Sequence, residues 1–252
     1  MTTNWDGYLW LLLLLGPLLI LQRSLHRNIQ AIFLLLTKRA EISLALFSLL
    51  FFPGVLIHEV SHFLVARLLG VGTGRFSLIP RAMPNGRLQL GYVETAKTDI
   101  LRDTLIGAAP LVAGGLFVAY AGLNRLGLEA VWVAIQSMQA SQVWAALGLI
   151  SEQQDFWLWF YLTFVVSSTM LPSAADRRAW PSVGIVLVVL LALALVSGAG
   201  QWMTETLSPL VNRALLALDI VLGISVLFHL ALLPLIWVIR RLLEKLTGLQ
   251  VT

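Results

Sequence analysis

Two histidines and one glutamate stand within five residues of one another in an apolar stretch of the chain. They form His58-Glu59-Val60-Ser61-His62, which is the H-E-x-x-H pattern. In a helix, residues four apart lie one turn apart on the same face, so these two imidazoles can bind one metal ion. Glu59 beside them can act as the catalytic base for a water molecule that the metal activates. The pattern predicts a hydrolytic site with one Zn²⁺ per chain.

A catalytic zinc site uses three protein ligands and keeps one position open. The chain contains no cysteine, so the third ligand must be an acidic residue or a further histidine. We expect Asp176, because it follows an expected membrane span directly, after Pro172, at the same membrane level as the two histidines. His229 stays open as an alternative. The sequence therefore predicts a zinc ion held by His58, His62 and Asp176.

The composition is that of an integral membrane protein. Of the 252 residues, 58% are hydrophobic and only 12% are charged, and the mean hydropathy is +0.86. These values lie well outside the range of soluble domains. The net charge of +4 fits loops that face a cytoplasm and anionic headgroups, and no aromatic–basic interleaving favours nucleic-acid binding.

The apolar runs predict one all-α polytopic domain over residues 1–252, with about six transmembrane helices. The segment 22–41 contains only eight consecutive apolar residues, too few to span, so we expect an interfacial helix there. The segment 127–150 has polar residues in its middle, and we interpret it as a helix at the membrane surface. The expected spans are 5–21, 42–69, 104–123, 156–171, 182–200 and 214–239.

The most polar stretch, 72–103, follows the helix that carries the histidines. Polar and apolar residues alternate on both sides of a Pro-Asn-Gly turn at 84–86, which predicts a β-hairpin at the membrane. The exposed edge of such a hairpin can pair with an extended peptide. Leu88, Leu90 and Val93 are therefore candidate substrate-binding residues.

The basic residues predict which end of the protein faces the cytoplasm. If the chain leaves its second span on the cytoplasmic side, that side carries ten basic residues, in 71–103, 172–181 and the C-terminal tail, against six on the other. Two expected spans separate His62 from Asp176, so both lie at the same face. We expect an active site nearer the cytoplasmic face.

Each of these residues also has a simpler interpretation. The H-E-x-x-H residues can be polar groups that satisfy one another by coincidence, although ionisable groups in an apolar span are costly and usually functional. Asp176 can be a loop residue that pairs with Arg177 or Arg178. His26 is most simply placed at the membrane interface, and His229 can pair with another helix or carry a proton.

From about Phe51 to Trp180 the chain resembles the site-2 protease family of intramembrane zinc metalloproteases. The strongest part of the resemblance runs from Pro53 to His62. The polar hairpin resembles the membrane-associated β-region that presents substrate in this family. The Gly-Ala-Ala-Pro sequence at 107–110 resembles the Ala-Gly-Pro start of the family's following helix.

The family's second motif is N-x-x-P-x-x-x-x-D-G, whose aspartate is the third zinc ligand. The resemblance implies that Asp176 has this role. The chain departs from the motif, because Ser168 or Thr169 stands at the asparagine position, depending on the alignment, and Arg177 stands at the glycine position. Ser168 and Thr169 are therefore candidate substrate-binding residues in place of the asparagine.

The resemblance implies hydrolysis of a peptide bond in or near the transmembrane segment of a membrane protein. The expected partners are that substrate and the lipid bilayer, with no nucleic acid. A second hypothesis is a catalytically inactive membrane binding or adaptor protein that retains the fold. A metal-ion transporter is a weaker third hypothesis, because it needs ionisable residues spread over several spans.

Overall fold

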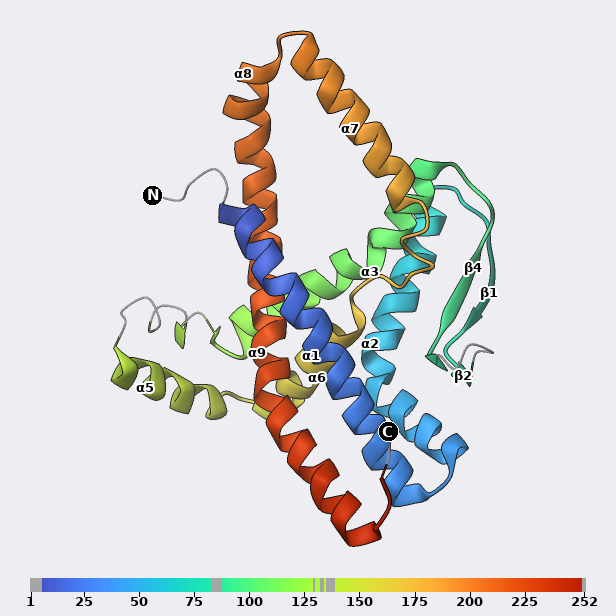
Figure 1. The fold of residues 1–252 in the computed structure, drawn as a ribbon, viewed down its shortest axis with the longest axis vertical. Helices are drawn as coiled ribbons and strands as arrows, with labels where there is room; N and C mark the ends of the chain where they lie inside the picture. Colours follow the sequence, from blue (N-terminus) through green and yellow to red (C-terminus); the bar gives the residue numbers. More distant parts are fainter. Residues whose placement is uncertain (1–5, 83–87, 129, 132–133, 135–138, 251–252) are drawn as a thin grey trace.

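The structure of the chain is a computed structural model that describes residues 6–82, 88–128, 130–131, 134 and 139–250. Four helices are long and apolar enough to cross a membrane, which supports an integral membrane protein (Figure 1). These four are Asp6–Thr37, Ala40–Leu68, Ile100–Arg125 and Gly200–Thr247.

The first helix, α1, runs without interruption from Asp6 to Thr37, through Pro17. The prediction of a separate interfacial helix over 22–41 is therefore wrong. A proline inside a helix removes one backbone hydrogen bond, but the chain can continue beyond it. The inner face of α1, which includes the fully buried Leu18 and Leu25, packs along α9 over most of its length.

The helix α2 spans Ala40–Leu68 and confirms the expected second span with its H-E-x-x-H residues. It ends where Gly70 adopts a left-handed conformation, with φ of 71°. The N–H of Val71 then donates to the carbonyl oxygen of Ala66 at 2.8 Å, and that of Gly70 to Arg67 at 3.1 Å. This glycine-dependent cap turns the chain back along α2 directly after the histidines.

The polar stretch after α2 forms two short antiparallel strand pairs that lie beside the C-terminal half of α2 (Figure 1). In the first pair, Phe76 lies opposite Val93, and in the second Ala82 lies opposite Leu88. This confirms the expected β-hairpin, whose turn at 84–86 lies outside the described residues. The strands are β1 Thr73–Ser77, β2 Arg81–Ala82, β3 Leu88–Gln89 and β4 Tyr92–Thr95.

Two helices pack closely against α2. The helix α3, Ile100–Tyr120, is capped by Asp99 and continues as the π-helix η1, Ala121–Arg125, so the expected span 104–123 is confirmed with an earlier start. The shorter α6, Phe156–Thr169, buries the run from Thr163 to Ser168 between α2 and α3. Glycines at the contacts, among them Gly54 and Gly114, let the backbones approach.

The segment 127–150 does not provide a described spanning helix. Its described helix, α5, covers Ala140–Ser151, and 12 residues are too few to cross a membrane. Residues 129, 132–133 and 135–138 of this segment lie outside the described part of the chain. Figure 1 shows α5 to one side of the main bundle.

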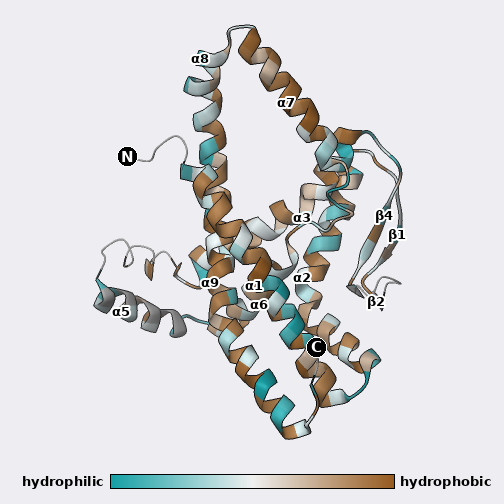
Figure 2. Ribbon diagram, viewed as in Figure 1, coloured by the Kyte–Doolittle hydropathy of each residue, from teal (hydrophilic) through white to brown (hydrophobic). Residues whose placement is uncertain are grey.

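The helix α7, Trp180–Val196, contacts α3 and extends away from the rest of the bundle, and it is mostly apolar (Figures 1 and 2). None of its 17 residues is buried. The short α8, Gly200–Trp202, and the π-helix η2, Met203–Leu207, lead into α9, Ser208–Thr247. Since α6 and α7 are shorter than the other apolar helices, four of the six expected spans are established as long enough to cross.

The C-terminal tail lies at the end of the molecule opposite the histidine end of α2. Arg240 on α9 donates to the side-chain oxygen of Asn28 near the end of α1 at 3.1 Å, and Ser43 at the start of α2 donates to the carbonyl of Gln30. The tail and the 71–103 loop, which the count of basic residues placed on one side, therefore lie at opposite ends of the molecule. Basic residues gather at both ends, and their distribution no longer distinguishes the cytoplasmic side.

Candidate metal centre

The three expected metal ligands converge, although 113 residues lie between the last histidine and the aspartate. The Nε2 atom of His62 lies 3.3 Å from Oδ1 of Asp176, and that of His58 lies 3.6 Å from Oδ2. The two Nε2 atoms are 3.2 Å apart. One ligand atom from each of the three residues lies within 4.8 Å of the others, so the group can hold a metal ion.

The other nitrogen of each imidazole is held by a backbone carbonyl. Nδ1 of His58 lies 2.7 Å from the carbonyl oxygen of Thr169, and Nδ1 of His62 lies 2.8 Å from that of Ile106. A carbonyl only accepts, so both Nδ1 atoms carry the hydrogen, and in the neutral ring Nε2 is left with a lone pair. This is the tautomer and orientation that metal-binding histidines use.

The two Nε2 lone pairs and the carboxylate of Asp176 therefore face one another. Three acceptor atoms in such proximity repel unless a proton or a metal cation lies among them. Two imidazoles and one carboxylate suit a divalent first-row metal, and this donor set alone does not distinguish Zn²⁺ from the others. The residues present fit a metal site, and nothing in their geometry opposes it.

Asp176 is positioned by the loop between α6 and α7. The N–H of Ser173 donates to its Oδ2 at 2.6 Å. Burial by itself would raise the pKa of the Asp176 carboxyl, but hydrogen bonds from His58 and His62 in their protonated form and from Ser173 outweigh burial and hold that pKa well below its usual range. The carboxylate is therefore charged at neutral pH, as a metal ligand must be.

The simpler interpretation of Asp176, as the partner of a neighbouring arginine, does not match the structure. Arg178 instead forms two hydrogen bonds with Asp103 on α3, at 2.7 and 2.9 Å. Arg177 donates to the carbonyl oxygen of Ser173 at 3.2 Å. Both arginines hold the loop in place and leave the Asp176 carboxylate facing the imidazoles.

The backbone of α3 also lies against this loop, at Gly107. A Cβ atom at that position would overlap the backbone carbonyl of Asp176. Only glycine permits this approach without displacing the loop.

Glu59 is buried beneath the β-region. A Cβ atom on Gly91 would lie 2.8 Å from Cγ of Glu59 and 3.0 Å from its Oε1. The segment between β3 and β4 therefore covers the expected catalytic base, Glu59, at contact distance.

The metal group and Glu59 line one cavity of about 610 Å³. Of the expected substrate-binding residues, Leu90, Val93, Ser168 and Thr169 also line it. The side chain of Leu88 lies outside the described part of the structure. The cavity therefore brings the metal group, the base and the β4 strand together.

His229, the alternative third ligand, lies elsewhere. Its Nε2 is 3.0 Å from Oγ of Ser168, and its Nδ1 is 2.7 Å from the carbonyl oxygen of Ser225. It is fully buried and does not belong to the metal group. It contacts the Ser168 hydroxyl and is not among the residues that line the cavity.

Sequence reasoning missed two residues of α1 that line the cavity, Gln22 and His26. The interfacial placement of His26 is wrong, because its ring packs edge-on against Phe47 and Phe51, with centroids 5.5 and 4.7 Å away. Gln22 donates from Nε2 to the backbone carbonyl of Ser168. Their i, i+4 spacing on one helical face was the available signal.

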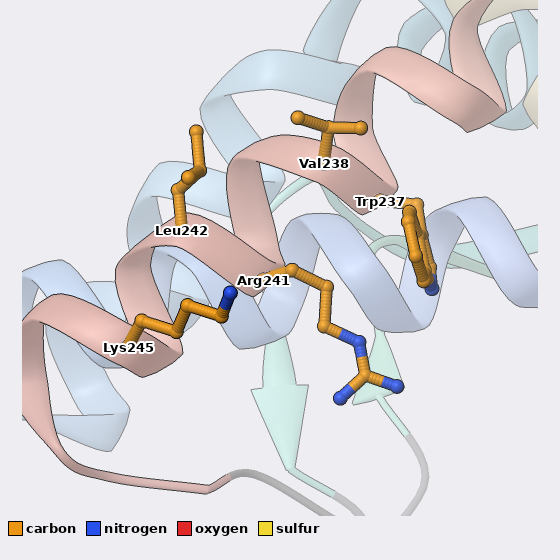
Figure 3. A pocket seen from close by; sticks show the side chains of 5 residues that line it. All are labelled: Trp237, Val238, Arg241, Leu242 and Lys245. Carbon is orange, nitrogen blue, oxygen red and sulfur yellow. The ribbon is translucent and has the colours of Figure 1, made fainter.

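A second hollow, of about 460 Å³, lies near the C-terminal end of α9, away from the metal group (Figure 3). Trp237, Arg241 and Lys245 project from this helix beside two aliphatic residues. The Arg241 guanidinium lies 5.4 Å from the Trp237 ring centre. Tryptophan and basic residues at the end of an apolar helix are typical anchors at the membrane interface.

Comparison with protein-family models, with curated proteins and with solved structures found no match to this chain.

Proposed function

We propose that this protein is an intramembrane zinc metalloendopeptidase of the site-2 protease type. One observation carries the proposal: His58 and His62 of α2 and Asp176 of a distant loop meet at metal-binding distances, in the cavity that Glu59 also lines. An ordinary polar contact requires neither the shared orientation of both imidazoles nor a glutamate beside them. A hydrolytic metal centre requires both.

The chain's own residues can supply the remaining chemistry. A zinc ion held by His58, His62 and Asp176 would polarise the scissile carbonyl and lower the pKa of a nearby water. Glu59 accepts a proton as the water oxygen attacks the carbonyl carbon. It returns that proton to the amide nitrogen as the carbon–nitrogen bond breaks, which releases a carboxyl group and an amine.

The substrate is a transmembrane segment in an extended conformation, because the amides of an intact helix are shielded by their own hydrogen bonds. β4 pairs with β1 along one edge, and no strand among the described residues pairs with its other edge. Val93 and Thr95 of β4 line the cavity. Addition of the substrate as a further strand would hold its backbone there.

The membrane-embedded part includes more than the four long helices. The helix α6 buries its run from Thr163 to Ser168 inside the bundle, and α7 exposes apolar side chains along its length, so both fit the lipid layer as shorter apolar segments. The orientation, with the metal centre nearer the cytoplasmic face, stays a prediction.

The proposal is tested by Glu59→Gln, with Glu41→Gln as the control. Glu41 lies in the first turn of the same helix and is exposed. Purified wild-type protein in lipid nanodiscs should hold one zinc per chain and cleave single-span reporter proteins. Glu59→Gln should keep the zinc and lose roughly 10²- to 10⁴-fold in cleavage rate, while the control should match wild type. Cleavage by Glu59→Gln at the wild-type rate would contradict the mechanism.

The second candidate is a membrane adaptor that keeps the metal centre without catalysis. The close cover of Glu59 by Gly91 favours it, because this cover narrows the space for a substrate peptide beside the base. Stoichiometric zinc without cleavage of any reporter would support the adaptor.

A further inference from the structure

The cavity extends from the metal group to a polar inner end on α1. Gln22 and His26 lie one turn apart on the same helical face, and both line the cavity with His58. Leu18 and Leu25, which flank them along this face, are fully buried. Two polar side chains in such apolar surroundings are costly unless they bind a polar group.

The inner end adjoins the metal group. Gln22 donates to the backbone carbonyl of Ser168, and His58 uses the carbonyl of the next residue, Thr169. Two neighbouring backbone carbonyls at the end of α6 therefore position the Gln22 side-chain amide and the His58 imidazole. A group bound at Gln22 would lie beside a peptide bound at the metal.

Aromatic rings close the cavity behind His26. Its ring contacts Phe47 and Phe51, and Phe51 lies 5.6 Å from Phe164 between ring centroids. Phe164 in turn lies 5.7 Å from His229. A cluster of packed aromatic rings therefore lies behind His26 at this end of the cavity.

The pocket has hydrogen-bonding capacity that the described residues do not use. Nε2 of His26 is enclosed and has no hydrogen-bond partner among them. Ser168 is already engaged, with its Oγ 3.0 Å from Nε2 of His229. A buried polar atom without a partner destabilises the protein, so this pocket is suited to a ligand that brings a hydrogen-bonding group.

The charges that line the cavity belong to its other end, where Asp103, Asp176 and Arg178 stand with Glu59. None of the described α1 residues that line the inner end is charged. A charged side chain would therefore lose its solvation there without gaining an ionic partner. An uncharged polar side chain fits best.

We propose that Gln22 and His26, beside Ser168, form a specificity subsite for an uncharged hydrogen-bonding side chain, such as asparagine or serine, next to the scissile bond. This inference rests on the proposed protease function. It predicts that the enzyme selects transmembrane segments that carry a polar residue at one fixed distance from the cleaved bond.

The test uses single-span reporters with a leucine-rich segment, in which each position around the cleaved bond is changed in turn to Ala, Asn, Ser or Asp. The kcat/KM of wild type should favour Asn or Ser over Ala at one position by about three- to tenfold, the usual effect of one hydrogen bond. Asp should give no such gain. Gln22→Leu and His26→Leu should bring this ratio to about one, and His26→Gln should keep it because it retains a hydrogen-bonding group.

Gln30→Leu is the matched control, because Gln30 lies two turns further along α1 and does not line the cavity. It should keep the wild-type ratio. A wild type that cleaves reporters without a polar preference would overturn the subsite, as would a preference unchanged in both Gln22→Leu and His26→Leu. A wild type that cleaves no reporter would instead count against the proposed function.

Discussion

Nδ1 of His62 lies 2.8 Å from the carbonyl oxygen of Ile106, a residue of the helix that follows the β-region. His58 makes the equivalent contact with Thr169 at the end of α6. Each imidazole is thus oriented by a different neighbouring helix. The metal centre is complete only when α2, α3 and α6 are packed together, so metal binding and folding should be linked.

Asp176→Asn should separate the metal centre from a simple loop contact. Loss of a group that only supports a ligand lowers metal affinity roughly 10- to 100-fold. Because Asp176 is the expected ligand itself, we expect Asp176→Asn to lower the zinc affinity by more than this. In wild type, zinc at about 100 times its Kd should stabilise the fold by about 2.7 kcal/mol. This gain should shrink below neutral pH, where protons compete for the imidazoles. Zinc titration against a competing chelator and thermal unfolding measure both effects.

Asp155→Asn is the matched control for this prediction. Asp155 is exposed before α6 in a left-handed conformation, with φ of 57°, which asparagine also tolerates. Its zinc affinity should equal that of wild type. Equal affinities in Asp176→Asn and wild type would contradict the assignment of the third ligand.

Gly107→Ala should disturb the ligand loop through the backbone. The added methyl group overlaps the carbonyl of Asp176, so α3 or the loop must move, at a cost of about 1–3 kcal/mol. Both the unfolding temperature and the zinc affinity should fall. Gly223→Ala meets no atom within 4 Å and should be neutral or stabilise α9 by up to about 1 kcal/mol. A Gly107→Ala protein as stable as Gly223→Ala would show that the two segments do not touch.

Gly91→Ala should impair catalysis and leave the metal in place. The methyl group would lie only 2.8 Å from Cγ of Glu59, so either Glu59 or the segment between β3 and β4 would be displaced. Because small misplacements of a catalytic group are costly, we expect kcat to fall roughly 10- to 100-fold. Gly72→Ala meets only Cβ of Ala96, at 3.7 Å, and should cleave like wild type. Loss of zinc in Gly91→Ala would point to general damage of the fold.

The sequence was sufficient for the features that depend on local pattern. The spacing of His58 and His62 places both imidazoles on one face of any helix, and in the structure their Nε2 atoms are 3.2 Å apart. The alternation of polar and apolar residues after Gly70 predicted the antiparallel strand pairs. Long apolar runs located α2 and α3 within a few residues, because helix length in lipid is set by hydropathy.

The features that depend on packing could not be predicted from local pattern. The break expected after residue 21 rested on the short apolar run of the segment 22–41. In the structure α1 continues through this segment, with Arg23 and Arg27 exposed while Gln22 faces the cavity. Similarly, α9 continues beyond its expected end, where Arg240 pairs with Glu244 at 2.9 Å. Polar residues in a membrane helix can therefore mark its interior-facing side and not its end.

Asp176 was the hardest residue to place, because no regular element carries it. Its position depends on the loop that Arg178 ties to α3, with Nε and Nη2 at 2.9 and 2.7 Å from the Asp103 carboxylate. The Arg178 side chain is 62% exposed, so the pair should contribute only about 0.5–1 kcal/mol to stability. Its larger role is to hold Asp176, two residues earlier, toward the imidazoles.

Arg178→Gln and Asp103→Asn should therefore each weaken zinc binding about two- to fivefold, the equivalent of 0.5–1 kcal/mol. Arg178→Lys should fall between wild type and Arg178→Gln, because an ammonium keeps the charge but cannot form both hydrogen bonds. Since the two residues act through one contact, the double variant should lose no more than either single variant. Arg213→Gln, an exposed arginine of α9, is the control and should bind zinc like wild type. Losses that add in the double variant would mean that the two residues act on the metal centre independently, and the loop would then need another explanation for its position.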